Sequence, residues 1–191
     1  MTLRYDTRSR VSTYTQSWVS NVDPDFGVFE SIATNIVGAG GSASFTFSVI
    51  PQTYKHLQLR IAAGNSSSAY LSLVMNSDTG SNYAFHRLSG DGATADANAS
   101  TSRADMILTG AGGMSTDANI RGGFIVDILD YANTNKYKTV RSLNGNDANG
   151  SGSMNLSSNV WLSTAAITSL TLSSSSNFRQ YSHFALYGIK G

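Results

Sequence analysis

The chain has 191 residues, of which 40% are hydrophobic and only 13% are charged, so it can form one domain with a genuine core. Its net charge of +1 at pH 7 gives no general attraction to nucleic acid or to a membrane surface, and neither partner is expected. The chain has no Cys, which excludes disulfides and thiolate metal sites. The N-terminus lacks the apolar segment of a signal peptide, and we expect synthesis in a bacterial cytoplasm.

Residues 1–28 differ from the rest of the chain, and we interpret them as an extended N-terminal arm. Ser12–Val19 is rich in β-branched and aromatic residues, which favours a strand that could pair with the sheet edge of another protein. The alternative is an arm that packs on its own domain or frays, as many termini do. The candidate docking residues of the arm are Arg4, Arg8, Arg10, Tyr14 and Trp18.

From Phe29 onward, short strand-like segments alternate with turn residues, which is typical of a sandwich or barrel. In Ser42–Val49 the side chains of Phe45, Phe47 and Val49 share one face, and in Lys55–Ile61 apolar and polar residues also alternate. Further strands are expected at 154–162, 167–173 and 181–189. The sequence therefore predicts an all-β fold, in which residues 29–191 form a single antiparallel β-sandwich, jelly-roll-like in topology.

Two hairpins are expected in the middle of the chain. The first joins Tyr70–Asn76 to Asn82–Leu88, and the second joins Phe124–Leu129 to Lys136–Ser142. The segment Phe124–Leu129 is apolar on both faces, as expected of a strand buried in the middle of a sheet. Its carboxylate, Asp127, then needs a partner, for which Lys138 and Arg141 are the candidates.

Several polar stretches are interpreted as connections. Gly90–Ser102 is small and polar and Thr109–Asn119 is Gly-rich, and both are expected to be long loops. Asn144–Asp147 and Asn149–Gly152 have the composition of turns with positive φ.

No residue pattern points to catalysis or to a cofactor. Nucleophile-elbow, dinucleotide-binding, P-loop and zinc-protease motifs are absent from the sequence, and no catalytic, cofactor-binding or metal-binding residue is predicted. His56, His86 and His183 lie in expected strands without a second ligand nearby in sequence, so a structural role is favoured. Asp127 and Asp130 are expected on opposite faces of one strand, and Asp91 with Asp96 lack the spacing of a calcium loop.

Five blocks of the sequence resemble virion proteins of tailed phages, including cyanophages. The resemblance covers Phe29 to the C-terminus, and it implies a structural β domain of the head-decoration or tail-fibre type, without catalytic residues to transfer. The arm has no counterpart in this resemblance. The blocks are Thr53–Arg60, Asn76–Tyr83, His86–Leu88, Asp127–Thr139 and Phe184–Gly191.

The leading hypothesis is a non-enzymatic capsid decoration, or cement, protein that binds the major capsid protein in the virion and stabilises the head shell. A homo-oligomer is expected, with a trimer as the natural choice. The alternative is a tail fibre or spike subunit, or a receptor-binding tip whose long loops contact host glycans. A capsule-degrading enzyme is the third hypothesis, and it would need a pair of carboxylates across a groove that the sequence does not indicate.

Overall fold

The computed structural model describes residues 28–110 and 113–191, which form twelve strands in two antiparallel sheets. No helix occurs within these ranges. The predicted all-β class and antiparallel sandwich are therefore confirmed. The predicted docking residues of the arm, from Arg4 to Trp18, lie outside the described residues.

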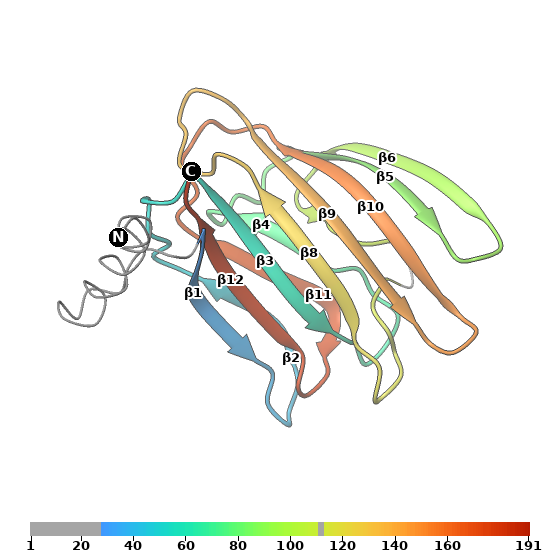
Figure 1. The fold of residues 1–191 in the computed structure, drawn as a ribbon. Coiled ribbons are helices and arrows are strands. Elements are labelled where there is room, and N and C mark those ends of the chain that lie inside the picture. Colours follow the sequence, from blue (N-terminus) through green and yellow to red (C-terminus); the bar gives the residue numbers. More distant parts are fainter. Residues whose placement is uncertain (1–27, 111–112) are drawn as a thin grey trace, which may run out of the picture.

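The two sheets differ in size, with eight strands in one and four in the other (Figure 1). The larger sheet has the order β1 (Phe29–Ile36), β12 (His183–Ile189), β3 (His56–Ala63), β8 (Gly122–Ile128), β9 (Lys138–Asp147), β10 (Gly152–Trp161), β5 (Tyr83–Gly90) and β6 (Ala95–Arg103). The smaller sheet has the order β2 (Ser42–Phe47), β11 (Leu170–Phe178), β4 (Ser72–Met75) and β7 (Met106–Ile107).

Eight of the strands follow the order of a jelly roll. The group β1-β12-β3-β8 forms one half of the sandwich and β2-β11-β4-β7 forms the other, so that strands far apart in the chain lie side by side in both sheets. The other four strands are two hairpins, β5-β6 inserted between β4 and β7, and β9-β10 inserted between β8 and β11. Because β9 pairs with β8 and β10 pairs with β5, both insertions extend the first sheet beyond the jelly roll.

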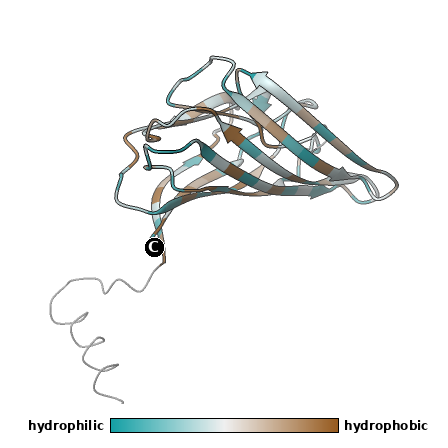
Figure 2. Cartoon of the chain, turned by 90° about the horizontal axis from the view of Figure 1, so that it is seen from above, coloured by the Kyte–Doolittle hydropathy of each residue, from teal (hydrophilic) through white to brown (hydrophobic). Residues whose placement is uncertain are grey.

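The core lies between the two sheets, and Figure 2 shows hydrophobic and hydrophilic residues distributed along the strands. In β3 the side chains of Leu57, Leu59 and Ile61 point inward and are buried, as predicted. Phe45 packs against Phe184, with ring centroids 4.3 Å apart, and so connects the two sheets. The prediction for Val49 is wrong, because β2 ends at Phe47 and Val49 is exposed at a positive φ of 54°.

The first predicted hairpin is wrong, because β4 and β5 belong to different sheets. The chain reverses at Asn76 and Ser77, which both have positive φ, and then crosses to the other sheet. Asp78 fixes this crossing, since its carboxylate accepts hydrogen bonds from Trp161 Nε1 (2.7 Å) and from Asn82. The second predicted hairpin is confirmed by the pairing of β8 with β9.

Two polar stretches that were expected to be connections are strands. Most of Gly90–Ser102 belongs to the β5-β6 hairpin, with a short turn in which Asp91 Oδ1 accepts from the backbone N–H groups of Ala93 and Thr94. Asn144–Asp147 continues β9. The turn predicted at Asn149–Gly152 is confirmed, with positive φ at Asn149 and Gly150.

Candidate interaction surface

The outer face of the eight-stranded sheet is not covered by the second sheet, and it carries apolar side chains. We define the open face as the outer face of β3, β8, β9, β10 and β5. An apolar row crosses it, made of cross-strand neighbours that face solvent: Ile125 (46% exposed), Leu143 (48%), Leu156 (52%) and Leu88 (61%). Aligned large side chains of this kind on an exposed sheet are typical of an interaction site.

Two of these strands, β9 and β10, carry polar residues on the face that points inward. Ser142 Oγ and Asn144 Nδ2 both donate to the carbonyl of Leu108, at 2.8 and 2.7 Å, and Asn155 Nδ2 donates to Asn144 Oδ1 at 3.1 Å. Asn155 Oδ1 in turn accepts from the backbone N–H of Gly110. These buried amides and hydroxyls hold the segment after β7 against β9 and β10. The inserted strands therefore reverse the usual pattern, with polar residues inside and apolar residues outside.

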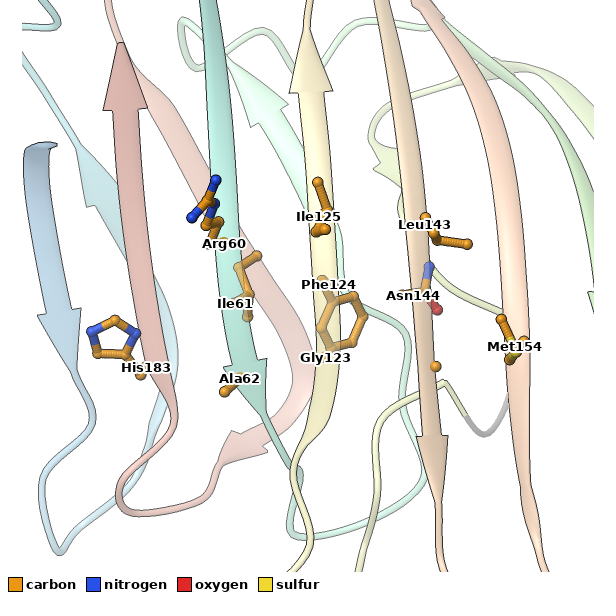
Figure 3. Close-up of a pocket in the computed structure, with 11 residues that line it drawn as sticks. Arg60, Ile61, Ala62, Gly123, Phe124, Ile125, Leu143, Asn144, Met154 and His183 are labelled. Carbon is orange, nitrogen blue, oxygen red and sulfur yellow. The ribbon is translucent and has the colours of Figure 1, made fainter. Parts of the chain in front are cut away.

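A row of small residues runs beside the apolar row, one step further along the strands. This small-residue row consists of cross-strand neighbours on successive strands of the sheet, and Met154 is its one large side chain. The neighbours are Ala62 on β3, Gly123 on β8, Gly145 on β9, Met154 on β10 and Gly90 on β5. Without larger side chains the sheet is hollowed over β3, β8 and β9, where Figure 3 shows Ile125, Leu143 and Met154 around the depression. The hollow has a volume of about 460 Å³.

A polar ladder borders the apolar row on the other side. Arg60 donates from Nε to Gln58 Oε1 at 2.9 Å, Gln58 Nε2 donates to Asp127 Oδ1 at 2.9 Å, and Arg141 Nη2 lies 3.8 Å from Asp127 Oδ2. The predicted pairing of Asp127 with Arg141 is confirmed. Pairing with Lys138 is wrong, because Lys138 is buried on the opposite face and donates to the carbonyls of Lys136 and Thr164.

The strand β8 corrects a second expectation. It does lie in the middle of the larger sheet, as predicted, but only its inner face is buried. Ile125 and Asp127 point to the open face, and Ile125 is almost half exposed. β8 thus carries apolar side chains on both faces, although the described residues bury only its inner face.

The ionic groups outside the open face have structural roles. Asp130 lies in the turn after β8 and forms ion pairs with Lys136 and with Lys55 (3.1 Å), and these two cations lower the pKa of Asp130 to about 2. Burial lowers the pKa of Lys138, and the charge of Lys136 lowers it further. Since β8 ends at Ile128, Asp130 is not on the strand with Asp127, and the two carboxylates have separate partners.

The three histidines do not come together. His56 Nδ1 accepts a hydrogen bond from the backbone N–H of Asp130, His86 is exposed on β5, and His183 lies at the rim of the hollow. Within residues 28–110 and 113–191, no three His, Cys, Asp or Glu side chains are grouped so that they could hold a metal ion. Asp96 contacts Ser89 and Arg87, apart from the turn that Asp91 closes.

The fold and its surface define the chain as a jelly-roll sandwich whose larger sheet is extended by two hairpins, with one face that the other described residues leave exposed. Comparison with protein-family models, with curated proteins and with solved structures finds no match. In the part of the chain that the structure describes, no helix is long and apolar enough to cross a membrane.

Sequence reasoning named the arm as the docking site and did not find the open face. A signal was present, because Leu143 and Leu156 each alternate with Ser and Asn residues at the neighbouring positions of their strands. Met154 on β10 does the same. Recognising the row also required the register of β5, which is distant in sequence from β8, β9 and β10.

Proposed function

We propose that this chain is a non-enzymatic structural protein of a bacteriophage particle, a capsid decoration protein that binds the head shell and stabilises it. The proposal is carried by one observation, the exposed apolar row on the open face. A row of this kind on an uncovered sheet is suited to binding another protein surface. The protein acts, in this proposal, by assembly within the virion.

The sequence resemblance, the jelly-roll fold and the two inserted hairpins each add support to this proposal. The resemblance of five sequence blocks to phage virion proteins suggests the biological setting. The jelly roll is used by viral capsid domains and also by lectins, so as a fold-level analogy it agrees with a particle surface without selecting a partner. The two inserted hairpins carry Leu143, Leu156 and Leu88, so most of the apolar row is an addition to the basic fold.

The alternative, a tail fibre subunit or receptor-binding tip, depended on two long loops for glycan binding. Most of Gly90–Ser102 is a strand, which removes the larger of these loops. The segment 113–119 is described without strand structure, and its Ser115 and Asp117 close local turns. The decoration hypothesis is therefore favoured over the fibre hypothesis.

The experiment that tests the proposal is the copy number of this chain in purified particles, measured by quantitative mass spectrometry against the major capsid protein. Decoration of the head predicts copies on the order of hundreds for each particle, because the shell repeats its binding positions. A few tens of copies or fewer would support the tail alternative. Absence from purified particles would overturn the virion proposal altogether.

Binding to the shell can be tested separately with particles that lack the chain. Purified protein added back should coat these particles and raise the temperature at which they release DNA. If the protein neither coats the particles nor changes their heat resistance, the decoration role is rejected.

A further inference from the structure

We infer that the open face binds a second copy of this chain, with the two faces packed against each other about a twofold axis. The inference rests on the proposed function and refines it, because it assigns the open face to a contact between decoration subunits and leaves attachment to the head shell to the N-terminal arm. Its test needs no virion. It is drawn from two arrangements on the open face: an apolar ridge lies beside a groove, and a positive and a negative side chain lie on the same strand, β9. Such self-complementarity is what a twofold contact requires.

The first complement is one of shape. The apolar row is a ridge, and beside it Gly123 and Gly145 leave a groove over β8 and β9 that ends at the exposed Met154 on β10. A twofold axis in the plane of the face, parallel to the two rows and between them, places the ridge of each copy over this groove in the other. Leu143 then lies over Gly145 of the second copy, and Ile125 lies over Gly123. On β10 the same axis places Leu156 against Met154, which is an apolar contact without a groove.

The second complement is one of charge. Arg141 and Asp147 stand on the outer side of β9, at equal distances in sequence on either side of Asn144. The same axis therefore brings Arg141 of each copy opposite Asp147 of the other, twice in the dimer. The Arg141 side chain is 60% exposed and lies 3.8 Å from Asp127, so it can reach a further carboxylate. Paired charges at the border of an apolar contact fix its register.

The size of the face agrees with a specific but moderate contact. Five strands spaced about 4.8 Å apart, with three rows of side chains about 7 Å apart, cover about 500 Å² on each copy. The dimer would bury about 1,000 Å² in total, at the lower end of specific protein interfaces. Two sheets that pack face to face in this way reproduce the arrangement inside a sandwich.

The test is the mass of the purified full-length chain in solution, measured by sedimentation equilibrium over a wide range of protein concentrations. The twofold contact predicts a mass of two chains that dissociates to one on dilution. The homotrimer expected from the sequence predicts three. A chain that stays monomeric at high concentration overturns the inference, and so does a trimer that the variants below do not alter.

Two sets of variants distinguish a fitted contact from general stickiness. Gly123→Val fills the groove, and a Cβ at this position meets no atom within 4 Å inside the chain, so the monomer should fold normally. We expect dimer affinity to fall about tenfold or more, because Ile125 of the second copy loses its place. A stronger dimer in this more apolar variant would contradict the fitted contact.

The charge register is tested by reversal. Arg141→Glu and Asp147→Arg alone should each weaken the dimer by about tenfold, and the two together should restore it. Val49→Thr, at an exposed position that follows β2 of the smaller sheet, is the control and should leave the mass unchanged. A double variant that remains monomeric overturns the proposed axis. Loss of the dimer without loss of particle coating would leave the decoration role standing.

Discussion

At the scale of single residues, Asp130 is the carboxylate with the largest lowering of its pKa among the described residues. Lys55 and Lys136 hold the pKa of Asp130 at about 2, below its ordinary value of 3.8. Because the folded-state pKa is the lower one, this carboxylate stabilises the fold above about pH 4 and loses that effect as the pH falls toward 2.

We predict that Asp130→Asn lowers the free energy of unfolding by about 1 kcal/mol at pH 7, a figure reduced for partial screening by solvent. Asn tolerates the positive φ of this position, so the turn should be kept. The loss relative to the wild type should shrink as the pH falls from 4 to 2. Urea unfolding over that range measures this, with Asp117→Asn in an exposed turn as the control. An equal difference at every pH would contradict the assignment.

The ion pair of Asp127 shows what single-residue reasoning could and could not reach. The sequence offered Lys138 and Arg141 as partners, and these stand at odd spacing on one strand, so they point to opposite faces. Only one of them could meet Asp127. Which one depended on the face that is buried, and that is decided by packing between sheets.

At the scale of the elements, β6 is the least protected strand of the larger sheet. It forms an edge, pairs with β5 alone, and almost all of its residues are exposed on either face. Few buried contacts support its hydrogen bonds, so local opening should require little free energy.

We predict that the amide protons of β6 exchange with solvent at least about a hundredfold faster than those of β3, which lies between two paired strands. Hydrogen exchange followed by mass spectrometry or NMR measures the difference. The amides of β12, also paired on both sides, provide the matched comparison. Equal protection of β6 and β3 in the monomer would show that the edge is stabilised in some other way.

The sequence predicted strands well where apolar and polar residues alternate, as in β3, and poorly where the side chains carry no such contrast. In β6 the residues are Ala, Asn, Asp, Ser and Thr, because neither face meets a core. In β9 the Asn-Gly-Asn-Asp segment has turn chemistry, and its pairing with both β8 and β10 overrides that preference. Long-range pairing determines these strands.

At the scale of the whole molecule, the sandwich contains its own core. The buried apolar residues extend from Val37 to Leu186, and β1 is held by its pairing with β12. We therefore expect the docking role predicted for residues 1–28 to be separable from folding.

We predict that deleting Met1–Asn21 changes the free energy of unfolding by less than about 0.5 kcal/mol, the usual range for changes away from a core. Attachment to the particle should be lost, because the arm is proposed to add a strand to a neighbouring protein. Denaturant unfolding and coating of particles that lack the chain measure the two effects. A truncated protein that coats particles normally would show that the arm is not needed.

The all-β class and the jelly roll could be predicted from the sequence, but the open face could not. Phe124–Ile128 did indicate apolar side chains on both faces of a central strand. That pattern was taken to mean burial within one chain, whereas Ile125 remains exposed in it. A single sequence does not say whether an apolar face is covered by the same chain or by another.

The position of β12 between β1 and β3 also determines when the protein can fold. Both neighbours are made early in translation, yet β1 has no partner strand in the sheet until residues 183–189 have been synthesised, and β3 has only β8 before then. Such distant pairing makes folding slow and leaves strand edges unprotected on the ribosome. The yield of folded protein should therefore depend on the chaperones of the cell that produces it.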